Sequence, residues 1–548
     1  MRQVMKHKNW LALIMVFVLL LGIVPLQPSV YAESENNMEQ ASSEESATLP
    51  EEGSPAPMSE SAATSEEEPA TTSEEESTST SQENTSPKGN TERGEVPKSR
   101  GDGGIAINET NFPDANFRTF VQENYDTDDN GSLSNEEIAN VTEISCGWKG
   151  IVDLKGIEYF TNLKQLDCGN NQLTSLDVSQ NTALESLLCY LNQLTTLDIG
   201  ANTALTELNC NSNQLTALDL SYNTVLTELY CSGNQLTALD LSRNTALMKL
   251  YCGYNNLASL DVSANIALTA LSFENNQLTS IDVSHNTALE SLSCENNQLT
   301  TLVTGQNTAL ERLYCGNNRL TSLDISQSTA LKNLSCFNNQ LTTLVTGQNI
   351  ALETLSCENN QLTTLDISQS PALKSLGCSE NQLTTLDISQ SPALKNLSCF
   401  NNQLTTLVTG QNIALENLSC ENNQLTSLDI SQSPALKGLD CFNNQLTTLV
   451  TGQNTALESL SCENNRLTSL DISQSPALKS LRCYVNQLTT LVTGQNAALE
   501  SLSCGNNQLT TLDISQSPAL KSLICSQNQL TTLVTGQNTA LEALNCYN

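Results

Sequence analysis

The sequence is poor in the residues that most catalytic sites need. Only two histidines occur in 548 residues, and one of them lies among the first 32. A processed chain would therefore keep only His285, around which no Ser/His/Asp or Cys/His arrangement can be assembled. No glycine-rich phosphate loop is present either. We therefore expect a protein that is not an enzyme.

Basic residues are also scarce. The chain has 23 Lys and Arg against 59 Asp and Glu, a formal net charge of −36. Such an acidic chain is a poor partner for nucleic acid or for an anionic membrane surface. After the first 32 residues no long apolar run occurs, so we expect no membrane insertion of the remainder.

The N-terminus has the pattern of a secretory signal at residues 1–32. Basic residues precede an apolar core at 11–24, and Val30-Tyr31-Ala32 offers a small-residue cleavage site. An uncleaved anchor helix is the alternative, although the apolar run is short for a membrane span. The pattern favours an extracellular protein that is secreted or held at the cell surface.

Residues 33–102 are rich in Ser, Thr, Glu and Pro and contain almost no large apolar side chains. Such a segment cannot bury a core, so we expect a disordered acidic linker. It ends in Arg100-Gly101-Asp102, an integrin-type tripeptide. A match of three residues arises easily by chance.

Residues 103–162 are predicted to form an N-terminal cap. A helix is expected over Asn111–Asn124, with Pro113 in its first turn. The segment Asp126–Glu137, DTDDNGSLSNEE, then fits the EF-hand calcium loop at every required position. Leu133 would tie the loop to the core. The alternative is a capping turn that binds no metal.

The loop predicts six calcium ligands by their positions. Side chains, a backbone carbonyl and a water held by serine would supply the oxygens that a hard divalent ion needs, from Asp126, Asp128, Asn130, Ser132, Ser134 and Glu137. Gly131 would permit the sharp turn. Extracellular modules of this kind bind weakly, so we expect calcium to be structural rather than regulatory.

From residue 163 to 548 one phrase recurs about nineteen times with a period of 21, counted by Cys168, Cys189, Cys210 and their successors. Its skeleton, Leu-x-x-Leu-x-Cys-x-x-Asn-x-Leu, is the leucine-rich repeat pattern. One turn cannot bury its leucines, but stacked turns can. We predict a leucine-rich repeat solenoid, α/β by convention, with a parallel sheet on its concave face and an irregular convex side.

Two further rows of residues are interpreted as structural. The asparagine that ends each strand, from Asn171 to Asn528, is predicted to satisfy backbone groups at the bend. The nineteen cysteines share one inward position, where Phe273 replaces one of them. Their parallel side-chain vectors suit disulfides poorly, so we expect buried free thiols acting as small hydrophobes.

The stretch from Asn111 onward, with Asn-Phe-Pro-Asp, the calcium-type loop, Gly156-Ile157-Glu158 and the cysteine-bearing repeats, resembles the secreted internalin-like proteins of Gram-positive bacteria. The resemblance implies export and use of the concave sheet to grip host surface proteins. The chain departs from that family by its core cysteines and its EF-hand-type cap. It stops in mid-repeat without a wall-sorting motif, from which we expect a truncated reading frame.

A second period of 42 residues begins near residue 294. Turns ending LVTGQN and LDISQS mostly alternate, so that Val303 is followed by Val345, Val408, Val450, Val492 and Val534 at steps of 42, 63, 42, 42 and 42. At the second position of the strands that follow these turns, Lys and Glu mostly alternate in step with the two classes of turn. Opposite charges on neighbouring turns attract, so we interpret the longer period as structural.

The outward positions beside the inward cysteine vary most and carry aromatic and acidic side chains. We predict that they form the ligand-binding face, with candidate contacts at Tyr190, Tyr230, Tyr251, Tyr314, Phe337, Glu358, Phe400, Glu421, Phe442, Glu463 and Tyr484. The alternative is that they merely cover the strands. We expect a monomeric adhesin that binds a protein or glycan on a host or bacterial surface; the alternative is a rigid spacer in the bacterial envelope or biofilm.

Overall fold

The computed structural model describes residues 104–536 and 538–547. The predicted signal peptide (1–32), the acidic linker (33–102) and its tripeptide Arg100-Gly101-Asp102 lie outside these residues. The described residues belong to one compact unit. None of their helices has the length and apolar character needed to cross a membrane.

A small cap precedes the repeats. Strand β1 (Ile105–Ala106) precedes helix α2 (Ala115–Tyr125), and strand β2 (Ser132–Leu133) follows it, before helix α3 (Asn135–Asn140). The two strands pair antiparallel. The expected helix is present but begins later than Asn111, because Asp114 is its N-cap and accepts a hydrogen bond from the Phe117 amide at 2.8 Å. Pro113 therefore precedes the helix and does not lie in its first turn.

The cap is continuous with the first turn of the stack. Strand β3 (Glu143–Ser145) and the 3₁₀ helix η1 (Ile157–Tyr159) follow it. The second carboxylate oxygen of Asp114 accepts a hydrogen bond from the Val152 amide at 2.8 Å. Phe112 and Leu133 are fully buried in the same core as the repeat leucines. The cap thus covers the apolar edge that the first turn would otherwise expose.

One parallel sheet of twenty strands runs through the stack from β3 to its last described strand, β34. It is open, because β3 pairs only with β4 and β34 only with β32 among the described residues. After β3 its strands are β4 (Gln165–Asp167), β5 (Ser186–Leu188), β6 (Glu207–Asn209), β7 (Glu228–Tyr230), β8 (Lys249–Tyr251), β9 (Ala270–Ser272), β11 (Ser291–Ser293), β13 (Arg312–Tyr314), β15 (Asn333–Ser335), β17 (Thr354–Ser356), β18 (Ser375–Gly377), β20 (Asn396–Ser398), β22 (Asn417–Ser419), β24 (Gly438–Asp440), β26 (Ser459–Ser461), β28 (Ser480–Arg482), β30 (Ser501–Ser503), β32 (Ser522–Ile524) and β34 (Ala543–Asn545).

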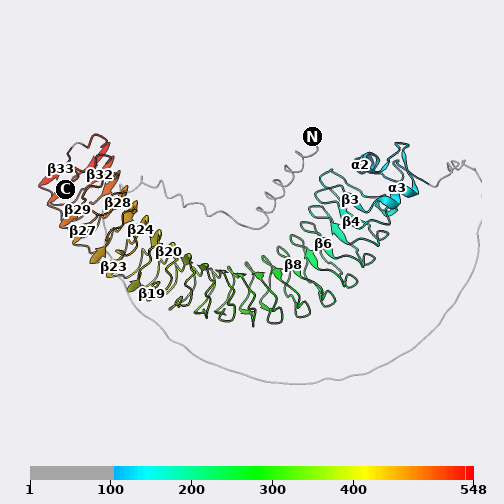
Figure 1. Ribbon diagram of the computed structural model, residues 1–548, viewed down its shortest axis with the longest axis horizontal. Helices are drawn as coiled ribbons and strands as arrows, with labels where there is room; N and C mark the ends of the chain where they lie inside the picture. The colour runs from blue at the N-terminus through cyan, green and yellow to red at the C-terminus, as the bar shows by residue number, and fades with distance from the viewer. Residues whose placement is uncertain (1–103, 537, 548) are drawn as a thin grey trace, which may run out of the picture. The chain divides into compact units, whose positions relative to one another are not determined.

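The register of this sheet follows from the repeat. From β4 onward, the central leucine of each strand pairs with that of the next turn, as Leu187 does with Leu208. This leucine and the cysteine two residues later point inward, so that Leu187 and Cys189 are both 0% exposed. The predicted leucine-rich repeat solenoid is therefore confirmed. Figure 1 shows its turns bending into an arc, with β6, β8, β20 and β24 on the inner side.

The convex side carries strands as well, which the sequence analysis did not predict. Six parallel pairs form there, each joining an Asp-containing turn to the Val-containing turn that follows it. They are β10 (Ser280–Asp282) with β12 (Thr301–Val303), β14 (Ser322–Asp324) with β16 (Thr343–Val345), β19 (Thr385–Asp387) with β21 (Thr406–Val408), β23 (Ser427–Asp429) with β25 (Thr448–Val450), β27 (Ser469–Asp471) with β29 (Thr490–Val492), and β31 (Thr511–Asp513) with β33 (Thr532–Val534).

The period of 42 residues thus has two structural causes. Convex strands pair in twos, and lysines bond to the glutamate one turn earlier, as Lys332 does to Glu311 at 2.8 Å and Lys479 to Glu458 at 2.7 Å. The predicted attraction between alternating charges is confirmed. These ion pairs are exposed, so each of them adds little stability.

Asparagines form two ladders inside the stack. The predicted ladder is confirmed: the Asn192 amide donates to the Cys168 and Cys189 carbonyls at 3.1 Å, and its oxygen accepts from the Leu173 amide at 3.0 Å. A second ladder on the convex side was not predicted. There the Asn202 amide donates to the carbonyls of Val178 at 3.0 Å and Asn181 at 2.9 Å.

All nineteen cysteines are free thiols, and only Cys546 among them is exposed. Burial raises the pKa of Cys210 to about 12 and that of Cys189 well above its ordinary value. A thiol with a raised pKa is protonated at neutral pH and unreactive. The structure therefore agrees with the expectation that these cysteines pack as small hydrophobes.

We expect iodoacetamide to modify one thiol in the native protein and all nineteen after denaturation. Intact-mass spectrometry before and after unfolding measures this count. Replacement of Cys546 by serine should remove the native labelling. Thiols that become reactive after denaturation only when a reductant is added would instead indicate disulfides.

Candidate binding face and calcium loop

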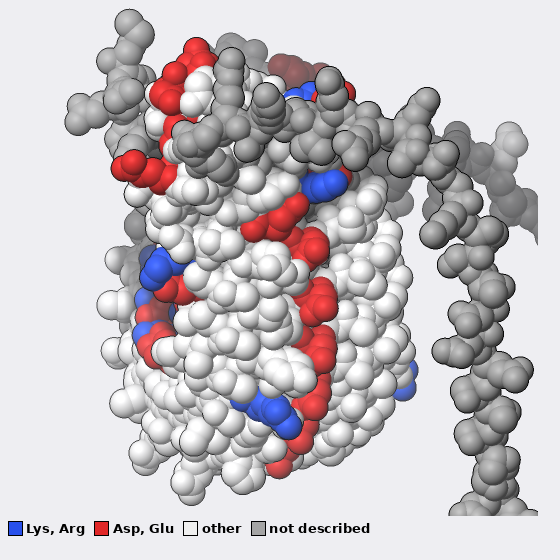
Figure 2. Space-filling model, turned by 90° about the vertical axis from the view of Figure 1, so that its right-hand side faces the viewer, with Lys and Arg blue, Asp and Glu red and all other residues white. Residues whose placement is uncertain are grey.

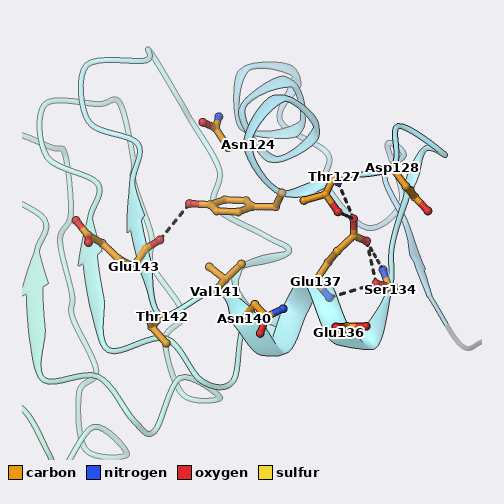
Figure 3. A pocket seen from close by; sticks show the side chains of 11 residues that line it. Asn124, Thr127, Asp128, Ser134, Glu136, Glu137, Asn140, Val141, Thr142 and Glu143 are labelled. Atoms are coloured by element: carbon orange, nitrogen blue, oxygen red, sulfur yellow. Dashed lines mark hydrogen bonds between the residues drawn. The ribbon is translucent and has the colours of Figure 1, made fainter. Parts of the chain in front are cut away.

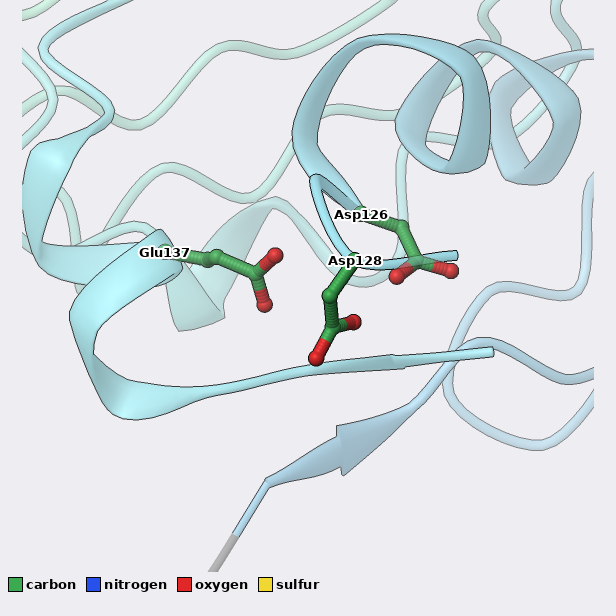
Figure 4. Close-up of side chains that lie close together, drawn as sticks. All are labelled: Asp126, Asp128 and Glu137. Carbon is green, nitrogen blue, oxygen red and sulfur yellow. The ribbon is translucent and has the colours of Figure 1, made fainter. Parts of the chain in front are cut away.

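The predicted calcium loop brings three carboxylates together. Oxygens of Asp126, Asp128 and Glu137 lie within 4.8 Å of one another (Figure 4), and no other group of three His, Cys, Asp or Glu side chains in the described part of the chain does so. Gly131 has a φ of 79°, a left-handed conformation that favours glycine. Leu133, fully buried, anchors the loop to the core as predicted.

The other predicted ligands lie in the same loop and hydrogen-bond within it. The Asn130 side-chain oxygen accepts from the Ser132 amide at 2.8 Å, and its nitrogen donates to Asp128 at 2.7 Å. Ser134 is the N-cap of α3 and forms a capping box with Glu137. The loop and the start of α3 thus support each other.

Glu137 is already engaged by hydrogen bonds. One carboxylate oxygen accepts from the amide and hydroxyl of Thr127 at 2.6 and 2.5 Å, and the other accepts from the amide and hydroxyl of Ser134 at 2.9 Å. Chiefly because of the Thr127 hydroxyl, the pKa of Glu137 is lowered from 4.5 to about 2. The ionised form therefore stabilises the fold above about pH 4.5, and this contribution is lost as the pH falls toward 2.

This donor set fits a hard divalent ion. Three carboxylates converge, and a hollow of about 640 Å³ opens beside them between the end of α2, α3 and β3 (Figure 3). The charged residues lining it are acidic: Asp128, Glu136, Glu137 and Glu143. An ion can therefore reach the loop from solvent. Chelation by both oxygens of Glu137 would replace its bonds to Thr127 and Ser134.

The predicted binding residues all lie on the outward face of the long sheet. We call the outward positions directly before and after each inward cysteine the concave rows. The row before it holds Tyr230, Tyr251 and Tyr314; the row after it holds Tyr190, Phe337, Glu358, Phe400, Glu421, Phe442, Glu463 and Tyr484. Tyr230 and Tyr251 stack on adjacent turns with ring centroids 5.1 Å apart.

These side chains are half-buried, and Glu463 is only 5% exposed. Three of them, Tyr190, Phe337 and Glu358, lie along the sheet where a neighbouring turn has glycine. A Cβ at Gly316 would come within 2.6 Å of the Phe337 ring, and one at Gly377 would collide with the Glu358 carboxylate. The concave rows are therefore a packed, low-relief surface and not a row of freely exposed aromatics.

The row after the cysteine is purely acidic in its charged members: Glu274, Glu295, Glu358, Glu421 and Glu463. Serine hydroxyls donate to three of them: Ser272 to Glu274, Ser335 to Glu295, and Ser356 to Glu358. Glu421 and Glu463 each keep a buried oxygen without a partner. Burial, with a contribution from Asp440, raises the pKa of Glu421 to about 7, and burial raises that of Glu463.

The sequence analysis missed one exposed row, two residues after the cysteine. Most turns place asparagine there with a positive φ, which asparagine tolerates. Trp148, Tyr254 and Val485 adopt the same conformation with 68%, 57% and 38% of their surface exposed. In the sequence, this row could have been found from bulky residues at positions where most turns have asparagine.

The aspartates of the convex turns have a structural role. Asp177, Asp198, Asp219, Asp240 and Asp261 recur once per turn, and Figure 2 shows such a column of acidic side chains. Each accepts a hydrogen bond from the amide two residues later, at 2.9 to 3.0 Å. They shape their own turns. His285 is exposed on this side, as predicted.

No protein-family profile matches the chain. A stretch of 71 residues is 39% identical to internalin J from Listeria monocytogenes serotype 4b (strain F2365), over 13% of this chain and 8% of that protein. The chain therefore matches only a small part of the length of its curated relatives.

Solved structures extend the likeness to most of the described residues. The functional domain of internalin J from Listeria monocytogenes, which includes a cysteine ladder, is 31% identical, with 76% of this chain and 78% of that chain covered and a TM-score of 0.53. The plant peptide hormone receptor RGFR1 in complex with RGF2 shares the fold, with 18% identity, a TM-score of 0.55 and coverage of 72% and 76%.

Proposed function

Because this chain belongs to the internalin-like leucine-rich repeat proteins, we propose that it is an exported bacterial adhesin, secreted or displayed at the cell surface. It binds a protein or glycan of a host or bacterial surface through the concave rows and performs no chemistry on it. The signal-like N-terminus of the sequence supports export. Solenoids of this kind commonly bind ligands on the concave surface that their curvature creates.

The concave rows are the observation that carries the proposal. They bring aromatic and acidic side chains from many turns onto one rigid sheet, whereas the core positions beneath them hardly vary. Side chains that already lie flat lose little conformational freedom on binding, and aromatic residues contribute most to contact energy. A partner could therefore be recognised by a surface that does not need to rearrange.

The EF-hand-type loop contributes stability and not recognition in this proposal. Asp126, Asp128 and Glu137 would hold one calcium ion, with Asn130 and the Ser132 carbonyl completing the set. The ion would bind together the end of α2 and the start of α3. The cap that covers the first turn would then be more rigid, and with it the N-terminal end of the binding face.

The adhesin proposal predicts that replacing Phe337, Phe400 and Phe442 together by alanine weakens binding of the purified chain at least about tenfold, because buried aromatic contacts dominate interface energy. Binding is measured to host-cell surfaces, matrix proteins and bacterial wall glycans, with calcium and with chelator. Alanine at Ile266, Ile350 and Ile413, exposed in convex turns by 61% to 65%, is the matched control and should leave binding unchanged.

A rigid spacer in the bacterial envelope or biofilm is the second candidate. It is favoured by the packing of Tyr190, Phe337 and Glu358 over glycines in neighbouring turns, which explains these three side chains without any ligand. Saturable binding to one host component that the phenylalanine variant loses would support the adhesin. Unchanged binding in that variant would show that the concave rows are not the contact surface, and the absence of saturable binding to any component would support the spacer.

A further inference from the structure

We propose that the turns from Glu421 to Tyr484 form a subsite in the concave rows for a basic side chain, lysine or arginine, of a protein partner. This inference rests on the proposed function of the concave face and adds the chemistry of its ligand. Three features of these turns lead to it: the alternation of aromatic and acidic side chains, two unpartnered carboxylate oxygens, and a strained apolar residue beside them.

Aromatic and acidic residues alternate here turn by turn. The row after the cysteine reads Phe400, Glu421, Phe442, Glu463 and Tyr484, and neighbouring turns are about 4.8 Å apart. Each carboxylate therefore lies between two aromatic rings. An ammonium or guanidinium group is attracted both by a carboxylate and by the face of an aromatic ring, so this order of residues suits a cation.

The two glutamates lack partners that their counterparts have. Glu463 is 5% exposed, and one of its carboxylate oxygens is buried without a hydrogen bond, as is one of Glu421. Buried polar groups are nearly always paired, and a buried carboxylate is costly unless a positive charge or a donor meets it. The carboxylate of Asp440 nearby adds negative charge. A basic side chain on the face above these carboxylates would supply the missing positive charge.

No hydrogen bond or ion pair among the described residues reaches these two oxygens, although a backbone hydrogen bond and the charge of Arg482 partly offset the burial of Glu463. None of the ion pairs among the described residues includes Glu421, Asp440 or Glu463. Arg482 lies on β28, one turn after Glu463, and makes no ion pair with it. The oxygens of these three carboxylates also do not converge closely enough to share a metal ion. A lysine or arginine reaching down from a partner fits better, because its positive charge attracts nearby carboxylates without having to bond to all of them.

Val485 adds an apolar margin to this subsite. It has a φ of 54° and is 38% exposed, at a position where most turns have asparagine. A β-branched residue is strained in this conformation, and such strain tends to be kept where it serves a function. Beside Tyr484, this side chain offers a surface for the aliphatic stem of a lysine or arginine.

The test uses the full chain and a fluorescein-labelled hexalysine peptide, with hexaglutamine as the neutral peptide. The double substitution Glu421→Gln and Glu463→Gln should weaken hexalysine binding at least about tenfold at moderate salt, because charge-assisted bonds to desolvated groups are lost. The matched control is Asp429→Asn with Asp471→Asn, which removes two exposed charges from convex strands β23 and β27. It should change binding less than about twofold, since exposed charges are screened.

One further variant and one further measurement keep the outcome interpretable. Arg482→Gln should leave binding unchanged or tighten it, whereas weaker binding would show that Arg482 organises the carboxylates and would overturn the inference. The double glutamine variant should unfold at the same or a higher temperature, because it removes unpaired buried charge. A lower unfolding temperature would assign both glutamates to the fold and would overturn the subsite.

Equal losses in the glutamine and the convex control variants would mean that hexalysine follows net charge alone, which also overturns the subsite. This failure is distinct from that of the proposed function. If the glutamine variant keeps hexalysine binding while alanine at Phe337, Phe400 and Phe442 abolishes binding to the natural surface, the concave face binds a ligand of other chemistry. If the alanine variant keeps its ligand, the proposed function itself is wrong.

Discussion

Replacing Asn297 with serine is expected to lower the free energy of unfolding by about 3 kcal/mol, because buried backbone groups would lose their partners. The Asn297 amide donates to the Phe273 carbonyl at 3.1 Å and to the Cys294 carbonyl at 3.2 Å, and its oxygen accepts from the Leu278 amide at 3.0 Å. Serine is too short to reach these three groups. The effect should spread to the neighbouring turns, since each turn is supported by those beside it.

Asn286→Ser, in the asparagine ladder of the convex side, is the matched control. The Asn286 amide donates to two carbonyls, at 3.0 and 2.9 Å, but its buried oxygen has no partner. Serine stands naturally at the equivalent position of other turns, as Ser328, Ser391 and Ser433. We expect a loss of about 1 kcal/mol.

Chemical denaturation compares the two asparagine variants, and hydrogen exchange at the Leu278 amide locates the effect. Equal losses in both would contradict the role assigned to the strand-end ladder.

Calcium at about 10 mM is expected to raise the free energy of unfolding of the cap by roughly 1–3 kcal/mol, given the weak affinity of extracellular EF-hand-type sites. The reason is that Asp126, Asp128 and Glu137 crowd three carboxylates within 4.8 Å, a repulsion that a divalent ion relieves. Asp128→Asn keeps the size of the side chain but removes a charged ligand. It should lose most of the calcium-dependent shift, which thermal unfolding with calcium and with chelator measures.

Asp129→Asn is the control for the calcium prediction. Asp129 lies in the same loop at a position that is not a predicted ligand, and its φ of 54° is one that asparagine also adopts. It removes the same charge, so a general electrostatic effect would reduce the shift in both variants alike. Magnesium at the same concentration should stabilise the cap less, because it demands a stricter geometry. The absence of any shift in the unsubstituted chain would show that the loop is a metal-free capping turn.

Much of the molecule was predictable because the same repeat recurs about nineteen times in the sequence. The inward leucines and cysteines, the strand-end asparagines and the lysine–glutamate pairs follow from spacing alone, since a residue 21 positions later occupies the same place one turn on. The convergence of three carboxylates in the EF-hand-type loop was predictable in the same way, because Asp126, Asp128 and Glu137 are close in sequence. The helix starts at Ala115 and not at Asn111 because the Asp114 side chain caps it, a local hydrogen bond that apolar spacing does not predict.

By itself, therefore, the sequence determined the solenoid, its inward rows and the composition of the concave rows. Only the tertiary structure decided how those outward side chains lie. Phe337 lies flat because Gly316 stands beneath it one turn away, and Glu463 keeps an unpartnered oxygen although Ser461 precedes it as Ser356 precedes Glu358. The convex strand pairs and the second asparagine ladder likewise arise from contacts between turns. The physical reason is that an outward side chain has no fixed place within its own repeat, so its burial and hydrogen bonds depend on what the neighbouring turns leave open.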